Sequence, residues 1–335
     1  MAFQQEIAAT PVIIDAHVHL VGISPTNGCF LSTKASRRFF RRFQHHALRL
    51  AGTNRAGFDR LARSRLQRRV DASGVNAVGL LALDGAYDAN GVRDERATSL
   101  YVSNDYLFEV ARDSPKYLPI PSVNPARRDA LDELDRVAEL GAVAIKVLPN
   151  TQNFDPASRV FLPFWQRMVH HRLPLLAHTG IEFTLPQHET VYGAPERLRP
   201  ALDEGLTVLA AHCGTAGGRG LTEHLGQWLA LLGEYPNLYG DLAALVSPAR
   251  MPFLSRILSD PLARQRVVLG SDYPVPVTPI LALRTLGLRR AWGLQRISNP
   301  IRRNLLALRA MGMDEEIERR ASRVLRMPAS TAGEE

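Results

Sequence analysis

Lysine, cysteine and long apolar runs are all scarce in this sequence of 335 residues. Its two cysteines, Cys29 and Cys213, are too few for a disulfide framework, which excludes the small disulfide-rich class and favours a reducing compartment. No apolar run is long enough to span a bilayer, and the first ten residues lack the basic and apolar regions of a signal peptide. We therefore expect a cytoplasmic protein with no membrane partner.

The formal net charge of +8 comes almost entirely from arginine, because lysine occurs only at Lys34, Lys116 and Lys146. A basic chain ordinarily suggests nucleic-acid binding or nuclease action. Here the arginines are spread along the chain, which indicates a bias towards arginine, and we expect no nucleic-acid partner. The same scarcity makes each lysine informative.

Eight apolar runs of strand length recur along the chain, with helical patterns between them, as in a parallel sheet wrapped by helices. The runs lie at residues 12–19, 75–83, 117–125, 142–149, 173–180, 207–214, 238–245 and 266–274. Helical patterns include residues 128–141, 157–172 and 220–236. Eight such units predict an α/β fold of the (β/α)8 TIM-barrel type. A doubly wound sheet is the second choice, but no GxGxxG follows the first run.

We predict one domain over residues 1–335. Residues 21–74 form a long excursion after the first strand, with an arginine-rich helical pattern, and are predicted to be a helical insertion that acts as a lid or an oligomer surface. Residues 298–326 are predicted to be closing helices, and residues 328–335 a flexible tail.

Reactive groups in such a barrel lie at the C-terminal ends of the strands. Six side chains of suitable chemistry fall at these ends: His17, His19, Lys146, His178, His212 and Asp272. Imidazole and carboxylate groups suit zinc and similar divalent ions. The His-x-His pair alone is as consistent with a structural role as with a metal site. The six residues together favour a metal centre.

Lys146 is the unusual member of this set. An ammonium in the middle of "AVAIKVL" is costly to bury unless it is paired or its charge is removed. Carbamylation by carbon dioxide would convert the amine into an anionic metal ligand. The alternative is an ordinary ammonium that pairs with a carboxylate or binds an anionic substrate.

Five stretches carry a resemblance to a known family: "IIDAHVHL", "GAVAIKVLPNTQNFDP", "LPLLAHTG", "LAAHCG" and "VLGSDYP". In this order they resemble the amidohydrolase superfamily, and more closely its amidohydrolase 2 branch of metal-dependent TIM-barrel hydrolases. The resemblance implies that His17, His19 and Asp272 bind the more buried metal. It implies that His178 and His212 bind a second metal or, in one-metal members, serve in ligation and in acid-base work respectively. Lys146 would be the carbamylated bridge of a two-metal site.

The resulting prediction is a metal-dependent hydrolase with one or two divalent ions, zinc being the first expectation. Asp272 and His212 are its predicted catalytic groups, and its substrate is a small molecule with an amide, ester, lactone or related bond. The alternative is a one-metal, non-oxidative decarboxylase of an aromatic or unsaturated acid, although such relatives usually lack the lysine on strand four. An inactive metal-binding scaffold is a further alternative, and assembly into a homo-oligomer stays open.

Overall fold

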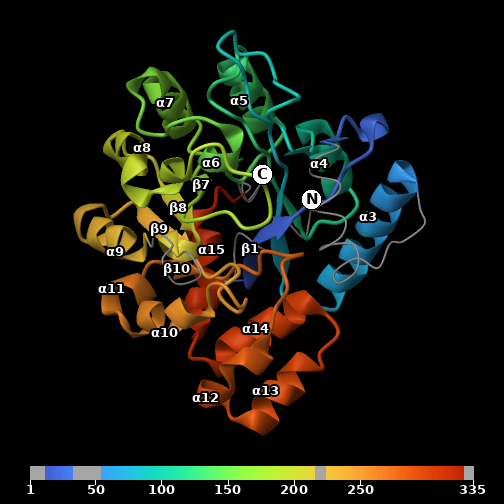
Figure 1. Ribbon diagram of the computed structural model, residues 1–335, viewed down its shortest axis with the longest axis vertical. Helices are drawn as coiled ribbons and strands as arrows, with labels where there is room; N and C mark the ends of the chain where they lie inside the picture. The colour runs from blue at the N-terminus through green and yellow to red at the C-terminus, as the bar shows by residue number, and fades with distance from the viewer. Residues whose placement is uncertain (1–11, 33–53, 216–223, 328–335) are drawn as a thin grey trace, which may run out of the picture.

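The computed structural model describes residues 12–32, 54–215 and 224–327 of the chain. Parallel strands occupy the centre of the molecule and helices surround them (Figure 1). The eight central strands are β1 (Ile14–His19), β3 (Ala77–Leu81), β5 (Tyr117–Ile120), β6 (Ile145–Val147), β7 (Leu175–His178), β8 (Val208–Ala211), β9 (Leu238–Asp241) and β10 (Val267–Val268). Each lies inside one of the eight runs predicted from the sequence, which confirms the (β/α)8 barrel.

The barrel closes by joining two arcs of strands. One arc has the order β1-β3-β5, and the other has the order β10-β9-β8-β7-β6. A parallel bridge between Ser122 and Lys146 joins β5 to β6, and one between Val18 and Tyr273 joins β10 to β1. At this second seam the backbone N–H of His19 also donates to the Tyr273 carbonyl at 2.8 Å. The first strand therefore meets the last.

Helices form the outer layer of the barrel (Figure 1). They are α3 (Arg55–Asp71), α4 (Asn104–Ala111), α5 (Ala130–Glu139), α6 (Pro149–Gln152), α7 (Leu162–His170), α8 (Arg199–Asp203), α9 (Leu225–Glu234), α10 (Met251–Ser259), α11 (Pro261–Arg264), α12 (Leu283–Leu286), α13 (Leu288–Gln295), α14 (Pro300–Ala310) and α15 (Glu315–Val324). The patterns predicted at 128–141, 157–172 and 220–236 contain α5, α7 and α9. None of the helices described is long and apolar enough to cross a membrane.

The predicted insertion at residues 21–74 is described in part. Its last portion forms α3. Asn54 caps the start of this helix, and its side chain accepts a hydrogen bond from the Gly57 N–H at 2.7 Å. Leu66 and Val70 of this helix are buried in the main core, so α3 belongs to the outer layer of the barrel. Residues 33–53, with the arginine-rich pattern, lie outside the described residues, as does the predicted tail.

The sequence patterns did not predict one short ribbon, and they made the last strand too long. A short antiparallel ribbon of β2 (Phe30–Leu31) and β4 (Leu100–Tyr101) was not predicted, because two-residue strands are too short to show a periodic pattern. The last predicted strand ran to residue 274, but β10 ends at Val268. Beyond it, Asp272 adopts a left-handed backbone with φ of 60°, which no strand residue can share.

The inner core fills the barrel below the polar end. It is built from inward-facing apolar side chains of the strands, among them Ile14, Ala77, Leu118, Leu176, Leu209 and Val268. Ala321 and Val324 of α15 complete the same cluster, so α15 closes this end of the barrel, and α14 and α15 are the closing helices predicted from the sequence. The opposite end carries the polar side chains that form the candidate site.

Candidate metal centre

A β-bulge in β1 aims both of its histidines into the barrel. The register of β1 against β3 shifts between Asp15 and Val18, so the alternation of inward and outward side chains reverses there. Below the shift Ala16 faces the inner core, and above it His17 and His19 point inwards side by side, with ring centroids 5.0 Å apart. The sequence predicted this pairing but not the bulge that places it.

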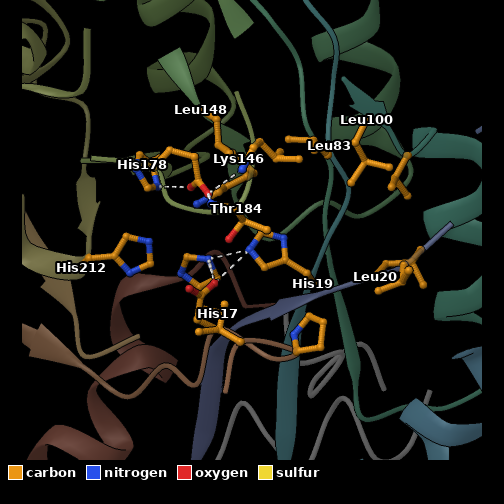
Figure 2. A pocket seen from close by; sticks show the side chains of 17 residues that line it. His17, His19, Leu20, Leu83, Leu100, Lys146, Leu148, His178, Thr184 and His212 are labelled. Atoms are coloured by element: carbon orange, nitrogen blue, oxygen red, sulfur yellow. Dashed lines mark hydrogen bonds and ion pairs between the residues drawn. The ribbon is translucent and has the colours of Figure 1, made fainter. Parts of the chain in front are cut away.

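His17, His19 and Asp272 form a compact group of ligand atoms. The Nε2 atoms of the two histidines are 3.2 Å apart, and the Oδ1 atom of Asp272 lies 3.2 Å from His17 Nε2 and 3.1 Å from His19 Nε2 (Figure 2). Among the residues described, these are the histidine, cysteine and carboxylate side chains that gather closely enough to hold an ion. Their mutual spacing fits a single cation between them.

Asp241 fixes the tautomer of His17. The Nδ1 atom of His17 donates to Asp241 Oδ2 at 2.7 Å, which leaves the lone pair of Nε2 facing His19 and Asp272. Burial lowers the pKa of His17 well below its ordinary value, and the charge of Lys146 lowers it further, so this ring is neutral. His17 Nε2 and Asp272 Oδ1 are 3.2 Å apart, and both are hydrogen-bond acceptors with no hydrogen between them. Their lone pairs repel unless a cation lies between the two atoms. The residues present therefore fit a divalent metal.

The carboxylate of Asp272 is held in its charged form. Burial acts to raise its pKa, but its interactions with the neighbouring rings of His17 and His19 outweigh that effect and keep the pKa below its ordinary value. Its backbone N–H donates to the His17 carbonyl at 2.9 Å. The two residues are thus fixed to each other through main chain as well as side chain.

His178 and His212 lie next to this group without joining it. Their ring centroids are 5.0 Å apart, and the His212 ring is 5.3 Å from that of His17. His212 Nδ1 donates to the Ala243 carbonyl at 2.9 Å, which leaves its Nε2 atom as an acceptor. His178 Nδ1 lies 3.5 Å from Glu182 Oε2, while its buried Nε2 has no hydrogen-bond partner. Burial, with the charge of nearby Arg250, lowers the pKa of both rings well below the ordinary value.

Lys146 is fully buried on β6, and its side chain reaches the same pocket (Figure 2). Burial lowers the pKa of its amine to about 8, and the attraction of Asp241, Asp272 and Glu182 opposes the change. Burial therefore shifts this lysine towards the neutral amine. Neutral amine is the form that reacts with carbon dioxide.

All six residues singled out from the sequence line one pocket at the C-terminal end of the barrel. Figure 2 shows the histidines and Lys146 on one side of it and Leu20, Leu83 and Leu100 on the other. The predicted convergence of these side chains on a single site is thus observed.

Two residues at the site have roles that the sequence did not reveal. Glu182, four residues beyond His178, brings a carboxylate into the pocket lining. Arg250 is buried and donates to Thr215 Oγ1 at 3.1 Å and to the Ile181 carbonyl at 2.7 Å, which ties together the loops after β7, β8 and β9. The position of Glu182, two residues after the motif around His178, was a usable signal. Arg250 carried no such signal, because it is one arginine among many in the sequence.

The amidohydrolase 2 sequence model, described as amidohydrolase, matches residues 14–294. No curated protein matches the chain. An uncharacterized TIM-barrel protein from Bordetella bronchiseptica is similar in structure, with a TM-score of 0.55 and 18% identity over 88% of this chain and 99% of that chain.

Two further solved structures are named for different reactions. A protein from Pseudomonas putida, provisionally named a 2-pyrone-4,6-dicarboxylic acid hydrolase, has a TM-score of 0.53 and 16% identity over 96% of each chain. A dihydroxybenzoic acid decarboxylase from Polaromonas, with bound manganese and the inhibitor 2-nitroresorcinol, has a TM-score of 0.50 and 15% identity over 92% of this chain and 97% of that one. These likenesses establish a shared fold. With the family match over most of its length, the chain belongs to the amidohydrolase 2 family.

Proposed function

We propose that this protein is a metal-dependent hydrolase that acts on an ester, lactone, amide or related bond of a small molecule. The observation that carries the proposal is the group of His17, His19 and Asp272 beside two buried histidines whose Nε2 atoms are free to act as acceptors. Such an arrangement combines a place for a cation with separate groups that can move protons.

His17, His19 and Asp272 would hold the ion, with His178 as a further ligand. When bound, a divalent ion polarises a substrate carbonyl and lowers the pKa of water, and zinc is the first expectation for imidazole and carboxylate ligands. The chain supplies the orientation: Asp241 holds His17 in the tautomer that a ligand needs.

Proton transfer falls to Asp272 and His212. The charged Asp272 carboxylate is placed to take a proton from an attacking water. His212 has its Nδ1 atom engaged with the Ala243 carbonyl, so Nε2 alone exchanges protons with substrate. It receives from Asp272 the proton taken from the water and passes it to the leaving group.

For Lys146 we propose carbamylation, supported by its burial and its lowered pKa. The neutral amine attacks carbon dioxide, and loss of one proton leaves a carbamate. Protein loaded with metal and ¹³C-bicarbonate should show a carbamate carbon signal that the Lys146→Met variant lacks. A metal-loaded wild type without that signal would mean that Lys146 works as an ammonium.

One-metal decarboxylation is the second candidate. It is favoured by the single compact ligand group, which suits one ion. The decarboxylase name of one structural neighbour points the same way.

Metal analysis and labelled water test both candidates. We expect stoichiometric divalent metal in the purified protein, and turnover of a panel of esters, lactones and amides that incorporates ¹⁸O from water into the acid product. Carbon dioxide release from aromatic acids without ¹⁸O incorporation would select decarboxylation. A protein that neither retains metal nor responds to added zinc, manganese, iron or cobalt would overturn the proposal.

A further inference from the structure

The pocket has two chemically different halves. One half carries the histidines, Lys146, Glu182 and Asp272, as Figure 2 shows in part. The other half is a wall of aliphatic side chains, which we call the apolar wall, and it includes Leu20, Leu83 and Leu100 (Figure 2). These residues come from the segments after β1 and β3 and from β4. A substrate that spans the pocket therefore meets reactive groups at one end and hydrocarbon at the other.

The charged groups of the pocket are all at the polar end. Lys146 is the single lysine or arginine among the lining residues, and it faces the carboxylates of Glu182 and Asp272. The guanidinium of Arg250 lies behind the lining, where it is engaged with Thr215 and the Ile181 carbonyl. Within the described pocket no cation faces the apolar wall. A substrate carboxylate placed there would lose its hydration without gaining a partner.

We propose that the substrate carries an uncharged alkyl or aryl group that packs on the apolar wall while its scissile carbonyl lies at the histidines. This inference rests on the hydrolase function proposed above. It adds that the pocket rejects compounds with a carboxylate at the far end, in contrast to the dicarboxylic acid in the name of the neighbour from Pseudomonas putida.

A series of p-nitrophenyl esters tests the inference directly. Each methylene added from acetate to hexanoate should raise kcat/KM by roughly two- to fourfold, because it buries hydrocarbon against the wall. The half-ester of adipate, which replaces the terminal methyl group of hexanoate by a carboxylate, should be turned over at least about 100-fold less well. A kcat/KM that is flat with chain length, or equal for hexanoate and adipate, would overturn the inference.

Leu100 offers a matched pair of variants. It is half-buried on β4, so a longer side chain can be accommodated towards solvent. Leu100→Arg should raise kcat/KM for the adipate half-ester by roughly tenfold and lower that for hexanoate, because the guanidinium supplies the missing partner. Leu100→Met keeps the wall apolar and should keep the preference for hexanoate over the adipate half-ester, whereas the remote surface variant Val160→Arg should behave as wild type. If Leu100→Arg leaves the selectivity unchanged, the wall does not contact the substrate.

Binding without turnover separates this inference from the hydrolase proposal. Calorimetry with uncharged n-alkyl amides, from butanamide to octanamide, should show affinity that rises with chain length in the His212→Asn variant. If that trend appears but no hydrolysis is found with wild type, the wall binds apolar ligands and the hydrolase proposal fails. If hydrolysis is found but neither binding nor kcat/KM depends on chain length, the hydrolase proposal stands and this inference fails.

Discussion

The Nδ1 atom of His17 lies 2.7 Å from Oδ2 of Asp241, and both side chains are buried. This hydrogen bond decides which nitrogen of His17 faces the pocket. Asp241→Asn presents a weaker acceptor and can turn its amide N–H towards the ring. We expect the affinity for zinc or manganese to fall by roughly 10- to 100-fold, measured by competition with a chelator of known affinity.

Asp84→Asn is a suitable control for that variant. Asp84 is also buried, but it accepts hydrogen bonds from the Asn124 N–H and the Tyr87 hydroxyl, away from the candidate ligands. We expect its metal affinity to equal that of wild type. Equal metal affinity in Asp241→Asn and wild type would mean that His17 does not bind the ion.

His212 is expected to act in catalysis and not in metal retention. Its ring is adjacent to that of His17 but is not part of the compact ligand group. His212→Asn should lower kcat by roughly 10²- to 10⁴-fold while the metal content stays at the wild-type level. The exposed His170 of α7 gives a control, His170→Asn, with unchanged kcat. Loss of metal from His212→Asn would assign the residue to ligation.

Lys146 gives the folded protein a distinctive pH dependence. Its pKa falls from 10.5 to about 8 on folding, so between these values the unfolded chain binds more protons than the folded chain. Wild type should therefore gain about 3 kcal/mol of stability relative to Lys146→Met as the pH rises from 8 to 10.5. That contribution is complete above the unfolded pKa and is lost as the pH falls through the folded pKa.

Urea unfolding of metal-free protein in buffers free of carbon dioxide measures this difference. The two proteins should differ in the pH dependence of their free energy of unfolding only over that interval. Parallel curves for the two proteins would show that the amine is solvated in the folded state.

Both cysteines should be inert in the folded protein. Cys29 and Cys213 are free thiols with 3% and 0% exposure, and burial raises the pKa of Cys29 to about 11 and that of Cys213 well above its ordinary value. A disulfide reagent such as dithionitrobenzoate should label neither residue within minutes in native buffer and both in denaturant. Rapid labelling of Cys213 would reveal opening of the segment beside His212.

Regular features of this molecule were predictable because they leave a pattern in the sequence. The eight inner strands are apolar on both faces and therefore read as continuous runs. His178 on β7 and His212 just after β8 were found because catalytic groups in a barrel lie at strand ends. Their place in one pocket followed from topology alone.

The features that the sequence did not predict depend on the backbone conformation of single residues. The bulge between Asp15 and Val18 and the left-handed backbone of Asp272 leave no periodic trace in the sequence. The β2–β4 ribbon contributes Leu100 to the apolar wall, but its strands have two residues each. The side of the pocket that Leu100 lines was therefore harder to foresee than the side that carries the candidate ligands.

The pairing of the first strand, β1, with the last strand segment affects the order in which the protein folds. His19 and Asp272 are 253 residues apart in the chain, and they meet only when the last strand pairs with the first. Contacts between residues so far apart in the chain form slowly, because closing the large loop between them costs chain entropy before the contacts stabilise the fold. A nascent or partly folded chain thus lacks the three-ligand group, and metal can be acquired only at the end of folding.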